Sequence, residues 1–298
     1  NINYPCLKHQ IILFIRNYLI EFYEPDTNIF ESNLHYLFNA LFETKHLLIS
    51  NTAADSLQYF FEVKRDESEN IKLSLLKVAT INIQNFNEHI KNTKISNFFD
   101  VLYQIMFNFD KKDSEFFIQI FINVCNRVHV EVERHIRLKF KIKKEKNKTK
   151  KKASEQTNNL NDYHIIINKC FNIIRMLMDC DKFVIINTQK IEESLTPLVM
   201  YMNEPKNIDF DEDIINVIYL LIKYNQKVTP LALSLIKNLY KYCDKVGGLL
   251  LDLYMLVNVY LAYGTEQILS NSECFEGILA VFNSGIKGHK FNKSPFFT

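Results

Sequence analysis

The sequence has few of the residues that β folds need at their turns. It contains only 6 Gly and 6 Pro among 298 residues, too few for the many tight turns of a β-sandwich or barrel. Hydrophobic residues nevertheless make up 47% of the chain, which is enough to bury a large core. An all-helical chain requires the fewest turns. We therefore predict an all-α fold, of a length that fits about two ordinary domains or one elongated array.

The cysteines lack the paired spacing of a disulfide framework or a zinc site. There are six of them: Cys6, Cys125, Cys170, Cys180, Cys243 and Cys274. We expect reduced thiols, packed as small hydrophobes in a cytosolic or nuclear protein. Cys125 and His129 have the spacing of a metal pair on one helix face, but a predicted helix break near Asn126 separates them and no further ligand is apparent. We predict no metal site.

Targeting and membrane segments also lack support. Residue 1 is Asn and no charged leader precedes a short apolar run, so we expect no signal peptide and a chain that is part of a longer one. The most apolar window, Val246 to Tyr263, is interrupted by Asp252 and Asn258. We interpret it as a buried helix and expect no contact with a membrane.

Motifs for catalysis are missing as well. The sequence has no Gly-rich phosphate loop, no Walker pattern, no nucleophile elbow and no paired histidine motif. We therefore predict that the chain is not an enzyme and uses no cofactor.

Helical periodicity runs through most of the chain, with short polar breaks. The predicted helices span about 5–23, 33–45, 46–63, 71–89, 95–109, 114–127, a second helix from 128, 163–180, a segment around 192–204, 212–225, 229–244, 250–264 and 272–284. Such helices form pairs in which each packs against the next. Whether Pro197 starts a helix or kinks one stays open, because Glu192 and Glu193 could already be helical.

One internal repeat supports an array of helix pairs. The segment from Asp113 can be laid over the segment from Asp211, with Arg127 against Lys227 at an offset of 100 residues. Each copy reads as an acidic cap, an apolar helix, a basic residue, Val and a second helix. Stacked pairs share a continuous core and form a superhelix. We predict a solenoid of HEAT-like antiparallel helix pairs, right-handed overall, with a concave inner surface.

The helix predicted from Thr229 begins with a strong signal. The Thr229 hydroxyl can accept from backbone N–H groups of the first turn, and Pro230 stands where no N–H is needed. Its polar side holds Ser234 and three candidate partner-binding residues, Lys237, Asn238 and Lys241. Two more candidates, Glu192 and Glu193, lie on a predicted inner helix. They would meet basic cargo, or form a solvated face.

An acidic group precedes the helix predicted from residue 212. Asp209, Asp211, Glu212 and Asp213 have the carboxylate density of a metal or acid/base site. Carboxylates are also favoured at a helix amino terminus by its unpaired N–H groups and dipole. We interpret the group as helix capping.

A basic insertion at about 139–161 is the most unusual feature. From Arg134 to Lys152 eleven Lys or Arg residues face one acid, Glu145, which gives a local charge of +10 and leaves −8 for the rest of a chain of net charge +2. The candidate residues are Lys143, Lys144, Lys146, Lys148, Lys150, Lys151 and Lys152. We expect a disordered segment that binds an acidic partner or an RNA backbone, acts as a nuclear localisation signal, or is a solvated loop. No aromatic residue lies between Lys141 and Lys152 for base stacking, so specific nucleic-acid binding is not predicted.

Three stretches resemble a known family. LLISNTAADSLQYF, EDIINVIYLLIKYNQKVTPLALSLIKNLY and GGLLLDLYMLVNVYLAYGTEQIL are similar to the middle and carboxyl-terminal HEAT repeats of importin-beta superfamily (karyopherin) transport receptors, closest to the importin seven and eight branch. The similarity runs in the same order from about Leu7 to Leu279. It implies a nuclear import receptor that shuttles between cytoplasm and nucleus. Its inner helices would wrap cargo proteins, Ran-GTP would release them, and nucleoporins are further expected partners.

Two departures bear on this resemblance. The amino-terminal repeats that carry the family's main Ran-binding surface have no counterpart in this sequence, so Ran-GTP would bind a part of the protein outside this chain. The family often carries an acidic loop in its central repeats, whereas this chain has a basic one. An exportin of the same superfamily and a HEAT or armadillo scaffold of a non-transport complex remain alternatives.

Overall fold

The computed structural model describes residues 4–21, 27–63, 69–108, 115–145, 150–202, 209–242 and 249–289. Over these ranges the chain forms thirteen α-helices, one short 3-10 helix and no strand. The prediction of an all-α helical-repeat solenoid is therefore confirmed. The chain divides into two compact units, Asn1–Leu177 (unit 1) and Met178–Thr298 (unit 2), which are described separately. The predicted right-handed sense of the superhelix stays a prediction.

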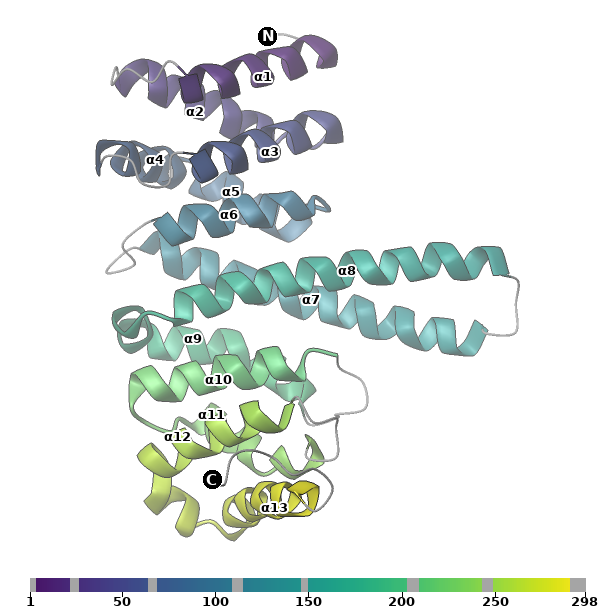
Figure 1. The fold of residues 1–298 in the computed structure, drawn as a ribbon, viewed down its shortest axis with the longest axis vertical. Helices are drawn as coiled ribbons and strands as arrows, with labels where there is room; N and C mark the ends of the chain where they lie inside the picture. The colour runs from purple at the N-terminus through teal and green to yellow at the C-terminus, as the bar shows by residue number, and fades with distance from the viewer. Residues whose placement is uncertain are drawn as a thin grey trace. The chain divides into compact units, whose positions relative to one another are not determined.

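Unit 1 contains eight helices in the part that the structure describes. They are α1 (Pro5–Glu21), α2 (Thr27–Leu41), α3 (Leu47–Val63), α4 (Glu69–Ile81), α5 (Ile83–Asn92), α6 (Ser96–Asn108), α7 (Glu115–Glu145) and α8 (Lys150–Met178), whose last residue already belongs to unit 2. Helix α3 packs against α1 and α6, whereas α2 packs against α4 and α5 packs against α7. The helices of the unit thus form two adjacent layers, as expected of stacked pairs (Figure 1).

Phenylalanine rings join these layers. Phe86 of α5 is fully buried, and its ring centroid lies 5.5 Å from Phe38, 4.9 Å from Phe42, 6.1 Å from Phe98 and 6.4 Å from Phe116. Several of these pairs meet edge to face, the arrangement that aromatic quadrupoles favour. One side chain of α5 therefore contacts rings from three neighbouring segments of the unit.

Helices α7 and α8 form a long hairpin whose outer part lies beyond the other helices of unit 1 (Figure 1). The His135 and His164 rings lie 6.2 Å apart across it. Two predictions were wrong here. The break near Asn126 is absent, because Asn126 faces solvent and the buried Arg127 finds its partners on α5. The insertion is helical up to Glu145 and again from Lys150, since Lys, Glu, Gln and Ala are good helix formers and no Gly or Pro interrupts them.

Unit 2 is built in the same way. Its described elements are α9 (Asp181–Tyr201), α10 (Asp211–Asn225), α11 (Pro230–Ile236), the 3-10 helix η1 (Leu239–Tyr242), α12 (Leu249–Leu269) and α13 (Ser272–His289). Helix α10 packs against α12, and α11 packs against both α9 and α13. Two buried tyrosines join neighbouring elements: the Tyr242 hydroxyl donates to the Met202 carbonyl, and the Tyr260 hydroxyl donates to the Ala232 carbonyl.

A glycine allows α11 and α13 to approach closely. A Cβ atom on Gly277 of α13 would lie 2.4 Å from the backbone carbonyl oxygen of Ile236, at the end of α11. Real Cβ atoms do not approach a carbonyl oxygen so closely, and a backbone atom cannot rotate away. The spacing of these two helices therefore depends on the missing side chain.

Three further boundaries differ from the predictions. The helix predicted over 71–89 is two helices, because the Asn82 side-chain amide donates to the Val78 carbonyl and ends α4. The helix predicted over 229–244 stops at Ile236 and is followed by η1. The two segments of the predicted internal repeat differ in structure. In the second segment Gln226 adopts a left-handed conformation (φ 51°) between α10 and α11, whereas in the first segment Arg127 lies inside the continuous helix α7.

None of the described helices is long and apolar enough to cross a membrane. Helix α12, which contains most of the apolar window, buries Leu253, Leu256, Val257 and Tyr260 against its neighbours.

Candidate functional site

The predicted partner-binding residues of unit 2 lie in α9, in η1 and in the short segment between α11 and η1. Helix α9 runs from Asp181 to Tyr201 through Pro197, so Pro197 does not start a helix and Glu192 and Glu193 lie in its interior. Lys237 and Asn238 follow α11, and Lys241 lies in η1. The side chain of Lys241 is outside the described residues, as is the whole of Cys243.

Glu192 has a structural role at the start of α11. Its Oε1 accepts a hydrogen bond from the Leu231 backbone N–H at 3.3 Å. The Thr229 side chain accepts from the Ala232 N–H at 3.4 Å, and Pro230 is the first helical residue, as predicted. Two of the otherwise unpaired N–H groups of α11 are thus satisfied by oxygen atoms from two different segments.

The remaining candidates point to solvent or to neighbours. Glu193 is exposed and accepts from the Gln189 side-chain amide at 3.0 Å. Lys237 forms an ion pair with Glu273 of α13 at 2.5 Å, which raises the pKa of Lys237 and lowers that of Glu273. No ion pair between the described side chains joins Lys237 to either glutamate of α9. The predicted set is therefore spread over the surface of unit 2 and does not form one cluster.

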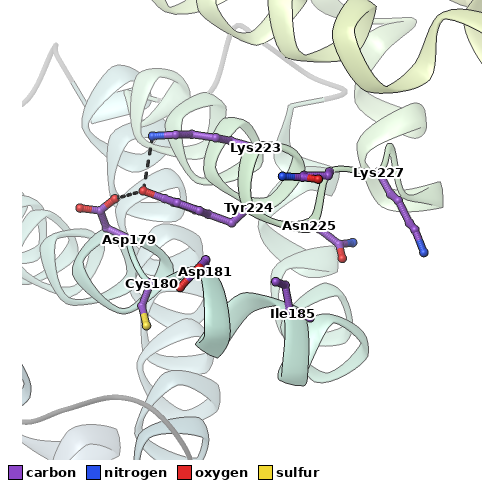
Figure 2. A pocket seen from close by; sticks show the side chains of 9 residues that line it. Asp179, Cys180, Asp181, Ile185, Lys223, Tyr224, Asn225 and Lys227 are labelled. Atoms are coloured by element: carbon purple, nitrogen blue, oxygen red, sulfur yellow. Dashed lines mark hydrogen bonds between the residues drawn. The ribbon is translucent and has the colours of Figure 1, made fainter.

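A pocket of about 600 Å³ opens where α10 ends and α9 begins (Figure 2). Its lining residues are Asp179, Cys180, Asp181, Ile185, Lys223, Tyr224, Asn225, Gln226 and Lys227. The Tyr224 hydroxyl donates to the Asp179 carboxylate, and the Lys223 ammonium donates to the Tyr224 hydroxyl at 3.4 Å. The hydrogen bond to Asp179 raises the pKa of Tyr224, and the one to Tyr224 raises the pKa of Lys223. Both groups therefore keep their protons at neutral pH.

Three of the acidic residues predicted to cap α10 lie within its first turn, whereas the N-cap position is Phe210, which makes no side-chain capping hydrogen bond. Asp211, Glu212 and Asp213 form the first turn of the helix, next to its unpaired N–H groups. Asp211 is buried. Burial of the Tyr242 hydroxyl, together with the charge of Asp211, raises the pKa of Tyr242 well above its usual value. No group of three or more His, Cys, Asp or Glu side chains that could hold a metal ion occurs within the described ranges.

The basic insertion lies at the outer end of the α7–α8 hairpin. Lys143 and Lys144 belong to the last turn of α7, and Lys150, Lys151 and Lys152 belong to the first turn of α8. Lys146 and Lys148 lie outside the described residues. Nearer the base of the hairpin, Arg137 pairs with Glu133 at 3.2 Å and Arg134 pairs with Glu131 at 2.6 Å. The positive charge is thus balanced at the base and concentrated at the outer end.

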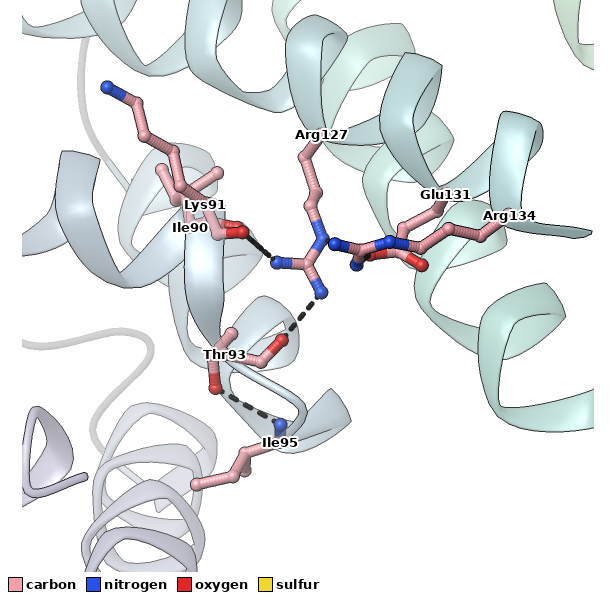
Figure 3. Close-up of polar contacts among 7 residues, drawn as sticks. All are labelled: Ile90, Lys91, Thr93, Ile95, Arg127, Glu131 and Arg134. Carbon is pink, nitrogen blue, oxygen red and sulfur yellow. Dashed lines mark hydrogen bonds and ion pairs between the residues drawn. The ribbon is translucent and has the colours of Figure 1, made fainter. Parts of the chain in front are cut away.

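A buried cluster of charged groups anchors the base of this hairpin (Figure 3). The Arg127 guanidinium of α7 donates to the backbone carbonyls of Ile90, Lys91 and Thr93 at the end of α5, at 3.0 Å for Ile90 and 2.6 Å for Thr93. Its Nε lies 2.9 Å from Glu131, and both side chains are almost fully buried. One guanidinium therefore satisfies the carbonyls that the last turn of α5 leaves unpaired.

The sequence offered no signal for the Arg127 cluster. Charged residues are usually exposed, and an Arg and a Glu four residues apart on a helix normally form a weak surface pair. Cys125 and His129 do share the helical spacing of a metal pair now that α7 is continuous. However, Cys125 is fully buried, and burial raises the pKa of its thiol, so the thiolate that a metal needs is disfavoured.

Comparison of the chain with protein-family models, curated proteins and solved structures gave no match.

Proposed function

We propose that this chain is a protein-binding helical-repeat scaffold, and that it acts in nuclear import as part of an importin-type receptor. Its partners would be cargo proteins, with Ran-GTP bound by amino-terminal repeats outside this chain and with nucleoporins met during passage through the pore. The protein would shuttle between cytoplasm and nucleus.

One observation carries the scaffold part of the proposal: amphipathic helices are stacked in layers with their polar sides at the surface. In unit 2, α9, α11 and α13 pack in sequence and expose Glu193, Ser234 and Lys237. Stacked helix pairs present extended surfaces on which affinity comes from many modest contacts. The transport part rests on the resemblance of the three quoted stretches to importin HEAT repeats.

A pull-down with the full-length protein tests the proposal. The protein is immobilised and exposed to cell extract, with and without an excess of Ran locked in its GTP form. We expect a set of proteins to bind and to be released by Ran-GTP, because an importin gives up its cargo when Ran-GTP binds. Ran locked in its GDP form is the matched control and should release nothing.

The other outcomes separate the alternatives. Proteins that bind only when Ran-GTP is added would indicate an exportin. Proteins that bind equally with and without Ran-GTP would indicate a scaffold of another class and would contradict the import proposal while leaving the scaffold part intact. If no protein is retained under any condition, both parts are contradicted.

A further inference from the structure

A second pocket, of about 270 Å³, lies in unit 1 between the end of α2 and one face of α5. Phe42 and Thr44 form one side, and Asn85, Glu88, His89 and Asn92 form the other. The residues from α5 are spaced at i, i+3, i+4 and i+7, so they share a single helix face. Apart from the Phe42 ring, every lining residue carries a polar side chain.

Glu88 differs from the acidic side chains of this unit that form ion pairs. Glu31 pairs with Lys77, Glu43 with Lys8, Glu131 with Arg127 and Arg134, and Glu133 with Arg137. Glu88 is exposed at the pocket and makes no ion pair or hydrogen bond with a described side chain. Among the described residues that line this pocket, its carboxylate is therefore the only charged group, and it is available to a ligand.

The deepest lining residue also lacks a partner. His89 is 6% exposed, and its Nε2 has no hydrogen-bond partner. The rings of Phe98 and Phe42 lie 4.7 and 5.6 Å from its imidazole. Burial and the nearby Arg127 charge lower the pKa of His89 to about 4, so the imidazole is neutral at physiological pH and adds no positive charge beside Glu88.

From this arrangement we infer that the pocket receives one lysine or arginine side chain of a partner protein. The Glu88 carboxylate pairs with the cationic head, and the oxygen atoms of Thr44, Asn85 and Asn92 are acceptors within the same pocket. The Phe42 ring packs against the aliphatic stem. The inference rests on the proposed function only in that the partner is a protein, and it does not depend on nuclear transport.

The size of the pocket favours a side chain over a small molecule. Ligand pockets for drug-sized molecules usually measure about 300 to 1,000 Å³, and this one falls just below that range. A single side chain presented by a larger partner needs no more room. Its contact is weak alone and adds to others across a long interface.

The test uses the chain with acetyl-lysine-amide and acetyl-arginine-amide as probes and acetyl-norleucine-amide as the uncharged control. Binding is followed by NMR, from the ring signals of His89 and the backbone amides of Glu88 and Asn92. We expect both cationic probes to shift these signals in a saturable way at millimolar concentration. The norleucine probe should shift them much less.

Two variants locate the binding. Glu88→Gln should weaken binding of the cationic probes by up to about fivefold, the upper end of the range for an exposed ion pair. Glu62→Gln removes an equal charge from an exposed position of α3 and should leave binding unchanged. Equal shifts with norleucine, unaltered affinity in Glu88→Gln, or no shift at these residues would each overturn the inference. None of these outcomes bears on release of cargo by Ran-GTP.

Discussion

At the scale of single residues, Arg127 has a clear structural role in unit 1. It lies inside α7 and contacts the end of α5, so it links two helices that are far apart in the sequence. Its charge is opposed by Glu131, which is buried almost completely. A buried pair of this kind contributes little net stability when intact, but removal of one partner leaves a charge without compensation.

Arg127→Met should therefore lower the free energy of unfolding of unit 1 by about 3 to 5 kcal/mol. The double variant Arg127→Met with Glu131→Met should cost less than the single variant, because it leaves no buried carboxylate. Chemical denaturation followed by circular dichroism measures both. A double variant that is as unstable as the single one would show that the lost carbonyl contacts of α5 account for the whole cost.

His89 gives the stability a dependence on pH. Its pKa is about 4 in the folded protein, below the ordinary value of 6.5. Between these values the unfolded chain binds a proton that the folded chain does not, so stability falls as the pH drops from 6.5 towards 4. The free energy of unfolding should fall by up to about 3 kcal/mol over this range. Urea denaturation across this range, compared with His89→Gln, isolates this contribution: the variant should show a flatter profile, and an identical profile would contradict the assignment.

At the scale of elements, the sequence predicted those features correctly whose physical cause lies within a few residues along the chain. The start of α11 was predicted because Thr229 and Pro230 act on their own first turn. The continuity of α7 was missed because Arg127 is satisfied by carbonyls more than thirty residues away. The helical hairpin was missed because polar composition was interpreted as disorder, whereas Lys, Glu and Ala also favour helices. Likewise, no pattern marks Glu192 as the residue that contacts the start of α11.

The contact between α11 and α13 offers a test of element spacing. Gly277→Ala should gain up to about 1 kcal/mol from helix propensity and lose about 1 to 3 kcal/mol from the clash with the Ile236 carbonyl. The clash outweighs the gain, so we expect a net loss of stability and faster hydrogen exchange in α11. Glu276→Ala, an exposed neighbour on the same helix, is the control and should be neutral or slightly stabilising. A stabilised Gly277→Ala variant would mean that the helices can separate at little cost.

At the scale of the whole molecule, the two units should respond separately to damage. Leu239 in η1 is fully buried, and Leu239→Ala should cost about 2 to 5 kcal/mol. In a stacked array each repeat contacts only its neighbours. The loss of protection against hydrogen exchange should therefore spread through α9 to α13, whereas α1 to α6 should keep theirs. Hydrogen exchange with mass spectrometry measures this. Leu37→Ala, a fully buried position of α2, should give the reverse pattern, and uniform loss of protection in either variant would indicate a single cooperative unit.

The chain can be divided into two fragments at the outer end of the α7–α8 hairpin. A cut between Glu145 and Lys150 falls at the end farthest from the base of the hairpin. Nearer that base, the His135 ring of α7 lies 6.2 Å from the His164 ring of α8. One fragment would end with α7 and the other would begin with α8, where Lys169 contacts Asp100 of the first fragment. Two polypeptides made separately at this point should each carry half of one interface and recognise the other. The hairpin would then act as a natural site for a split protein whose halves report on their own encounter.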